Sequence, residues 1–141
     1  MRPVSPVTAL LLILSTASAF AQEQPEVNCQ EAVTQMDLNI CAHRDYEAAD
    51  MELNSIYRQA IAAMQETDKE LGDINAAHVG AVGALKKAQR AWIGYRDGQC
   101  ELAGFEARGG SMEPMLVSGC LADLTRKRTA ELKELLEPAG N

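Results

Sequence analysis

Four cysteines are the side chains with the clearest chemistry in this sequence. They are Cys29, Cys41, Cys100 and Cys120. Four thiols can form two disulfides or contribute ligands to a zinc site. The chain has no Cys-x-x-Cys pair, and its only histidines are His43 and His78. Disulfides are therefore predicted, as is typical of short exported chains with an even number of cysteines.

One pairing of these cysteines follows from their positions around a turn. Cys100 and Cys120 stand at equal distances from Gly110, which belongs to the turn-forming segment Arg-Gly-Gly-Ser at 108–111. If antiparallel helices meet there, residues equidistant from the turn face each other. We therefore predict the pair Cys100–Cys120, which leaves Cys29–Cys41 as a local loop. Each bridge is expected to contribute about 2–4 kcal/mol.

The same turn is the candidate site for contact with a partner. Gly109 and Gly110 offer backbone N–H groups with little bulk, which suits insertion into a narrow cleft. Arg108 adds a guanidinium that pairs well with carboxylates. A plain helix–helix turn, with Ser111 capping the next helix, would use the same four residues. Both interpretations remain open at this point.

Other reactive side chains form no recognisable catalytic or metal pattern. His43 and Glu47 are four residues apart, but such pairs are common on exposed helix faces. Ser111 and Ser118 lack an adjacent His–acid arrangement in the sequence. We predict no catalytic residue, no cofactor and no metal, and a protein that is not an enzyme.

A second group of residues is expected to act inside the protein. Trp92 and Arg96 are one helical turn apart on an apolar stripe, and a buried arginine needs a carboxylate partner. We predict that Arg96 pairs with Asp50 and that Asn54 completes the hydrogen bonds. The predicted structural network comprises Asp50, Asn54, Trp92, Tyr95, Arg96 and Arg128.

Three helical patterns must position these residues. Thr34 and Asp37 match a capping box, and apolar residues then recur every three and four positions. This predicts a helix over 35–65, with the charged segment 67–75 as a loop. The second run extends from Val79 to Phe105 and ends at the glycine turn.

The third helix is expected after the turn and before Pro138. Its predicted inward face comprises Leu116, Val117, Leu121, Leu124, Leu132 and Leu135. No long stretch alternates with period two, so strands are not expected. The predicted fold is an all-α, antiparallel bundle of three main helices with a short N-terminal helical turn, stapled by two disulfides, in one domain over 22–141.

The N-terminus predicts export. Arg2 precedes a short apolar run, and small residues follow, so we predict a signal peptide over 1–21 that is cleaved after Ala21. The run is shorter than the ~20 residues of a spanning helix, and Cys29 lacks the small apolar lead-in of a lipidation site. We therefore predict a periplasmic or secreted protein with no membrane anchor in its mature form.

The composition narrows the range of partners. The chain has 141 residues, of which 47% are apolar and 23% are charged, with a net charge of −7. Such a chain is globular rather than disordered, and it repels the phosphates of nucleic acids. A basic protein partner is expected instead.

The ordered set of residues resembles the LprI family over about residues 29–135. The matching elements are Thr34-Gln35, Cys41-Ala42, Tyr46, Ala49-Asp50, Leu53-Asn54, Tyr57, Leu85, Ala88-Gln89-Arg90-Ala91-Trp92, Tyr95-Arg96-Asp97, Cys100, Gly109-Gly110-Ser111, Cys120-Leu121, Thr125 and Arg128. The resemblance implies an exported helical domain with paired cysteines, whose named activity is inhibition of lysozyme.

This resemblance sets the functional expectation. Animal-type lysozymes are basic proteins that cut peptidoglycan with two carboxyl groups in a cleft. An acidic inhibitor would be steered toward such a protein, and the turn at 108–111 would block the cleft. The alternative is an envelope protein that binds a partner without inhibiting lysozyme. The sequence does not fix an oligomeric state.

Overall fold

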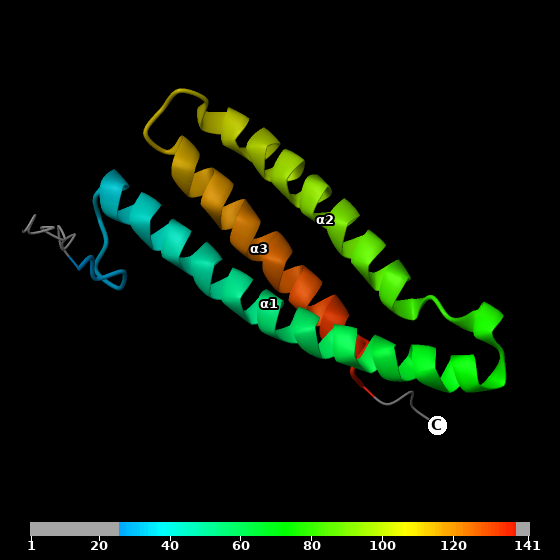
Figure 1. Ribbon diagram of the computed structural model, residues 1–141. Helices are drawn as coiled ribbons and strands as arrows, with labels where there is room; N and C mark the ends of the chain where they lie inside the picture. The colour runs from blue at the N-terminus through cyan, green and yellow to red at the C-terminus, as the bar shows by residue number, and fades with distance from the viewer. Residues whose placement is uncertain (1–25, 138–141) are drawn as a thin grey trace, which may run out of the picture.

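The protein folds into three long helices joined by short connections (Figure 1). The computed structural model describes residues 26–137, so the predicted signal peptide lies outside the described residues. The elements are α1 (Gln35–Ile74), η1 (Ala76–His78), α2 (Ala81–Gly104), η2 (Phe105–Ala107) and α3 (Glu113–Glu134). No strand occurs in this part of the chain. The predicted all-α bundle with two disulfides is confirmed.

In Figure 1, α1 and α3 run from the upper left to the lower right and α2 runs back in the opposite direction, so α1 and α3 are parallel to each other and α2 is antiparallel to both. Two ion pairs fix the register of α1 on α3. Asp45 pairs with Arg126, and one heptad further along each helix Glu52 Oε1 lies 2.6 Å from Lys133 Nζ. None of the described helices combines the length and the apolar character that a membrane span requires.

The core lies where the three helices meet. Leu53, Ala60, Leu85 and Leu132 form its buried centre. The apolar stripe predicted for the first helix is confirmed, because most of the surrounding side chains come from α1. These partly buried neighbours are Ile56, Tyr57, Ile61, Met64, Trp92 and Leu136.

The predicted inward face of the third helix is wrong in part. Its fully buried residues are mostly small or hydroxyl-bearing: Ser118, Ala122, Thr125, Thr129 and Leu132. Because α3 lies between two helices that approach it closely, small side chains occupy the centre of the seam. Four of the predicted residues flank it half-buried, and Leu135 is 48% exposed.

The first helix is longer than predicted, because the segment expected to be a loop is the last part of α1. Residues 67–74 contain good helix formers, and Lys69 Nζ lies 3.0 Å from Glu66 Oε1 one turn earlier. These contributions outweigh the cost of Gly72, which is about 1 kcal/mol relative to alanine. The helix ends at Asn75, whose side chain caps η1 by accepting from Ala77 N.

A carboxylate on this extension caps the next helix. Asp68 accepts hydrogen bonds from the backbone N–H groups of Gly80 and Ala81 at 2.7 Å and of Val82 at 3.1 Å. These bonds, with that from Gly80 the most important, hold the pKa of Asp68 below its ordinary value. Gly80 itself, with φ of 159°, offers no side-chain cap. The carboxylate thus ties the end of α1 to the start of α2.

Replacing Asp68 by asparagine is expected to lower the melting temperature by several degrees near neutral pH, because one amide oxygen replaces two charged acceptors. The folded-state pKa is depressed, so this stabilisation is present above the unfolded pKa of about 4 and is lost as pH falls through the folded pKa. Thermal melts near pH 7 and near pH 2.5 check this. The two proteins should differ at neutral pH and converge in acid, and a constant difference would contradict the assignment.

Two disulfides close the other end of the molecule. Cys100 and Cys120 join α2 to α3 with their Cα atoms 5.3 Å apart, and Cys100 is fully buried. Cys29 and Cys41 join the N-terminal segment to α1. This segment makes a single turn, in which Glu31 N donates to Asn28 O.

The apolar residues of α2 divide between two faces, although the sequence pattern predicts one run. Leu85 and Cys100 are buried against the other helices. Tyr95, Leu102 and Phe105 are more than half exposed. Within the buried set and within the exposed set, apolar residues recur every three or four positions, and the two sets alternate along the chain. The sequence pattern alone therefore predicts one broad apolar stripe.

Candidate partner-binding surface

The turn at 108–111 is held in one conformation by Glu113. The Glu113 carboxylate accepts from Arg108 Nη1 at 2.9 Å and from Gly109 N at 2.7 Å. Gly109 has a φ of +78°, which glycine adopts without strain. The Arg108 guanidinium also lies 4.4 Å from the centre of the Phe105 ring. The turn is therefore exposed and internally braced.

Neighbouring helices fix the position of this turn. Asn39 Nδ2 of α1 donates to the Ser111 carbonyl at 2.9 Å. A Cβ atom at Gly104 would lie 2.7 Å from Val117 Cγ2, so α2 and α3 converge at the turn only because Gly104 lacks a side chain. Together with the Cys100–Cys120 bridge, these contacts anchor the turn to all three helices.

Ser111 does not cap the third helix, and this part of the prediction is wrong. The N-cap residue is Met112, and its side chain makes no capping hydrogen bond. The chain needs one further residue to complete the turn, since Gly110 N donates to Ala107 O and Glu113 N donates to Gly110 O. Pro114 stands in the first turn of α3, where its missing N–H leaves no helical hydrogen bond unmade.

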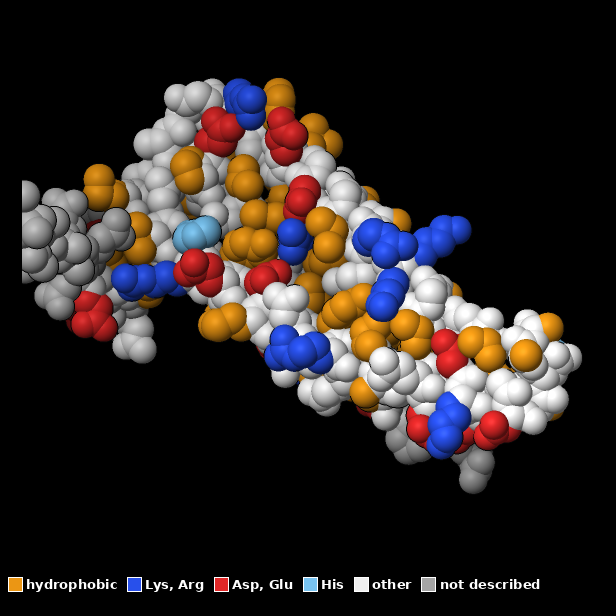
Figure 2. Space-filling view, in the orientation of Figure 1, with side chains coloured by type: hydrophobic (Ala, Val, Ile, Leu, Met, Phe, Trp, Pro, Cys, Tyr) orange, Lys and Arg blue, Asp and Glu red, His pale blue; other side chains and the backbone are white. Residues whose placement is uncertain are grey.

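Two adjoining hollows open beside the turn. The larger, of about 590 Å³, lies between α1 and α3 and includes Gly109 and Gly110 in its wall. The smaller, of about 280 Å³, lies between α2 and α3. Both share the α3 residues Glu113, Val117 and Leu121. Figure 2 shows hydrophobic side chains gathered over this part of α3, between α1 and α2.

Acidic side chains surround this apolar floor (Figure 2). Asp97 and Glu101 stand on the α2 side, and Glu113 stands next to the turn. His43 lines the α1 side, with its Nε2 3.5 Å from Glu47 Oε1. Two of the local cations already have partners, because Arg108 pairs with Glu113 and Arg96 with Asp97. Asp97 and Glu113 are therefore already engaged, and Glu101 is the acidic side chain lining the smaller hollow that takes part in none of the described ion pairs. The hollows suit an apolar side chain that carries a cationic group toward Glu101.

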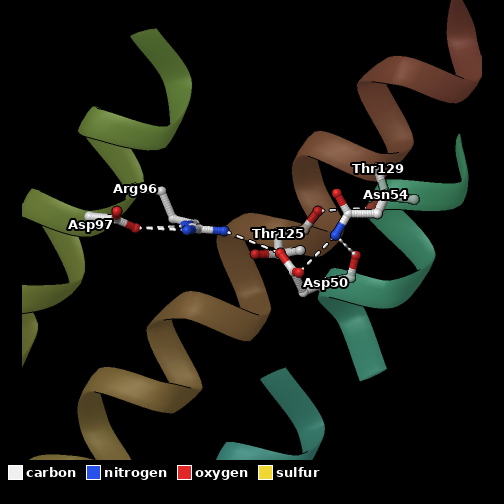
Figure 3. A network of polar contacts seen from close by, with 6 residues as sticks. All are labelled: Asp50, Asn54, Arg96, Asp97, Thr125 and Thr129. Carbon is white, nitrogen blue, oxygen red and sulfur yellow. Dashed lines mark hydrogen bonds and ion pairs between the residues drawn. The ribbon is translucent and has the colours of Figure 1, made fainter. Parts of the chain in front are cut away.

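Arg96 connects the helices beneath this surface (Figure 3). Its guanidinium lies 2.8 Å from Asp97 Oδ1 and 3.5 Å from Asp50 Oδ1 on α1. Asn54 Nδ2 donates to Asp50 Oδ2 at 2.8 Å. The Arg96 side chain is only 10% exposed. The structure thus brings Arg96, Asp50 and Asn54 into one network.

Aromatic rings complete the surroundings of this arginine. The guanidinium carbon of Arg96 lies 5.1 Å from the Trp92 ring and 5.5 Å from the Tyr46 ring, which are cation–π distances. Tyr95 is not among the rings that contact Arg96, and it is 58% exposed. Arg128 forms a separate group, in which its Nε donates to Gln89 Oε1 at 3.1 Å and its Nη1 to Glu131 at 2.8 Å.

Several residues of this region were not among the predicted site residues. Tyr46 and Gln89 belong only to the set that resembles the family, although they contact Arg96 and Arg128. Thr125 is fully buried, and its hydroxyl has no hydrogen-bond partner in the described structure. Glu113 could have been found from its spacing to Gly109, since a carboxylate four residues after a turn glycine can reach back to its N–H.

No cluster of three or more His, Cys, Asp or Glu side chains with metal-binding geometry occurs among residues 26–137. His43 and Glu47 remain an exposed pair on α1. The two hollows beside the turn combine an apolar floor with the acidic side chain of Glu101 at the edge, and apolar contact with a charged rim is a property of protein-binding surfaces.

Comparison with known proteins places this architecture in a family. The family model described as "Lysozyme inhibitor LprI" matches residues 27–132. An uncharacterized protein of Rhizobium meliloti (strain 1021) is 74% identical over the whole length of both chains. The uncharacterized protein YecT of Escherichia coli (strain K12) is 30% identical over 69 residues, which are 47% of this chain and 41% of that protein.

A solved structure shares the fold. The crystal structure of a DUF1311 family protein from Pseudomonas putida KT2440 superposes with a TM-score of 0.60 at 22% sequence identity. The match covers 72% of this chain and 93% of that one. The helical arrangement therefore persists where most side chains differ.

Proposed function

The chain belongs to the family described as lysozyme inhibitor LprI, and from this premise we propose that it inhibits a lysozyme or related muralytic enzyme by blocking the substrate cleft. The turn at 108–111 is the part that enters the cleft. The protein has no catalytic role in this proposal, and it acts by binding alone.

The bracing of the turn by contacts from all three helices is the observation that carries the proposal. Glu113, Asn39 and the Cys100–Cys120 bridge hold the turn from three directions. A loop that is ordered before binding loses little conformational entropy when it enters a partner. Inhibitory loops benefit from this preorganisation, because they must remain in a cleft shaped for another ligand.

Charge supports a basic target. The chain has 20 acidic and 13 basic side chains, and Glu101, which takes part in none of the described ion pairs, lines the hollow between α2 and α3 beside the turn. Animal-type lysozymes are basic, so long-range attraction would raise the rate of encounter. This attraction weakens as ionic strength rises, because salt screens exposed charges.

The disulfides support a location outside the cytoplasm. Two structural disulfides are typical of proteins that fold in an oxidising compartment. The apolar segment at 8–14 and the cleavage signal ending at Ala21 would direct export to the periplasm or medium. Peptidoglycan and the enzymes that attack it are found in that same compartment.

Replacing Arg108 by glutamate is expected to weaken inhibition at least tenfold in a cell-wall clearing assay with animal lysozyme. The new carboxylate repels Glu113, which opens the turn, and it also repels the acidic catalytic groups of the cleft. A tenfold change corresponds to about 1.4 kcal/mol. Arg108→Ala should give a smaller loss, because it removes the cation without adding an anion.

Arg58→Glu is the matched control for this charge reversal. Arg58 is exposed on α1, about 28 Å along the helix from Asn39, which contacts the turn. This variant changes the net charge equally, and it should inhibit nearly as well as the wild type. Equal losses in both variants would point to general electrostatics rather than the turn, and unchanged clearing with excess wild-type protein would refute the proposal.

A second candidate function is binding to an envelope protein without inhibition of lysozyme. The observation that favours it is the pairing of Arg108 with Glu113, since a guanidinium already engaged is less available to carboxylates in a cleft. Affinity capture from envelope extracts separates the two functions. A dominant partner that is not muralytic, recovered by wild type and lost with Arg108→Glu, would support this second candidate.

A further inference from the structure

The outward face of α2, continued by Phe105 at the start of η2, carries an uninterrupted stripe without charge. Its members recur at alternating spacings of four and three residues, and all are exposed. They are Ala84, Ala88, Ala91, Tyr95, Gly98, Leu102 and Phe105. This is the a/d spacing by which one helix packs along another. We call these seven residues the α2 stripe.

None of the other described helices packs on this stripe. The buried residues of α2, including Leu85 and Arg96, lie on the face turned toward α1 and α3. The three large members of the stripe remain 58%, 62% and 54% exposed at Tyr95, Leu102 and Phe105. Of these three, only Phe105 is partly covered, because the Arg108 guanidinium lies over one face of its ring. A stripe of this length is about 32 Å long.

The order of side-chain sizes along the stripe identifies the occupant. The N-terminal half is small, with three alanines, and the C-terminal half is large, with Leu102 and Phe105. In an antiparallel pair of α2 helices, Ala84 faces Phe105 of the second copy, and Ala88 faces its Leu102. Tyr95 then meets its own counterpart at the two-fold axis. Large groups fill the space above small ones at both ends of the seam, and the small pair Ala91 and Gly98 on each side of the axis leaves room for the two tyrosine rings.

The charges beside the stripe match in the same register. The N-terminal half of α2 carries Lys86, Lys87 and Arg90, whereas the C-terminal part carries Asp97, Glu101 and, in η2, Glu106. The register that faces Ala88 with Leu102 also places Lys87 beside Glu101 of the second copy, twice by symmetry. A parallel pair would instead bring like charges together, which is unfavourable.

We propose that the α2 stripe is a self-association surface, on which α2 packs antiparallel on α2 of a second copy of this chain. The interface is formed by one helix from each copy, so it lies at the small end of specific protein interfaces. The dimer is accordingly weak, with a dissociation constant on the order of tens of micromolar. This inference does not depend on the proposed inhibition of lysozyme.

Sedimentation velocity across a concentration series, from about 1 to about 300 μM, tests the proposal. The wild type should shift from monomer to dimer over this range. Ala91→Glu places a carboxylate in the seam, and it should weaken dimerisation at least tenfold. Ala62→Glu, at an exposed position of α1, is the matched control and should leave the dimer unchanged.

A charge exchange tests the antiparallel register itself. Lys87→Glu and Glu101→Lys should each weaken the dimer severalfold at low salt, whereas the double variant should restore it, because each new pair is again of opposite charge. Circular dichroism verifies that every variant is folded. A monomeric wild type at the highest concentration, a dimer insensitive to Ala91→Glu, or a double variant that is not restored would each overturn the proposal.

Discussion

Replacing Cys100 and Cys120 together by alanine is expected to lower the melting temperature by about 10 °C or more. Cross-linking residues that are 20 positions apart restricts the unfolded chain, which is worth about 3 kcal/mol on the chain-entropy model. In a domain of this size each kcal/mol changes the melting temperature by about 3–5 °C. Thermal unfolding followed by circular dichroism measures the difference.

The variant lacking Cys29 and Cys41 is the matched control. That bridge spans 12 residues, so loop length alone predicts a similar loss. However, Cys29 belongs to an exposed segment that contributes nothing to the buried core. Without the bridge, the conformational entropy of this segment rises in the folded state as well as in the unfolded state. The two increases partly cancel in the free energy of unfolding. The melting temperature should fall by less than half as much, and an equal fall would contradict this account.

Arg96→Ala is expected to destabilise the fold by about 2–3 kcal/mol. Removing one partner of a buried ion pair typically costs 3–5 kcal/mol. The cost here is smaller, because the side chains of Asp50 and Asp97 are 37% and 56% exposed and water can solvate them. The loss also includes packing of the guanidinium between Trp92 and Tyr46. Urea denaturation gives the free energy of unfolding directly.

Two comparisons distinguish a structural role of Arg96 from a binding role. Arg96→Lys keeps the charge but loses the planar fork, and it should be intermediate in stability. At a temperature where the Arg96→Ala variant remains folded, it should still inhibit lysozyme in the clearing assay. In the wild type the Arg96 guanidinium is buried beneath the binding surface and would not contact the partner. Lost inhibition with unchanged stability would instead assign Arg96 to partner contact.

Periodicity in the sequence was sufficient to predict the number, order and direction of the helices. The position of Cys100 and Cys120 around Gly110 fits two antiparallel helices that meet at one turn, and the structure has that geometry. Half of the predicted capping box forms, since Thr34 Oγ1 accepts from Asp37 N at 3.1 Å, whereas the Asp37 carboxylate accepts from the Thr34 hydroxyl at 2.7 Å and not from the Thr34 backbone. These features depend on residues that are close in sequence or related by simple symmetry.

Features that depend on contacts between distant segments could not be predicted in this way. The extension of α1 past residue 65 is stabilised partly by Asp68 acting on the start of α2, which no local propensity reveals. Ser111 was assigned as a cap because of its residue type, but Glu113 and Asn39 determine the geometry of the turn. The two faces of α2 interleave in sequence, and only the packing of α2 against α1 and α3 separates them.

The two disulfides divide the described chain into separately closed parts. One lies between the N-terminal segment and α1, and the other joins α2 to α3. The short connection at 75–80 is therefore the sole covalent link between these parts. A protease that cut it would leave an α1 fragment and an α2–α3 hairpin, held together by non-covalent contacts: side-chain packing, ion pairs and hydrogen bonds such as that from Asn39 to Ser111. The fold thus has the covalent organisation of a two-fragment protein, in which the braced turn stays intact on one fragment.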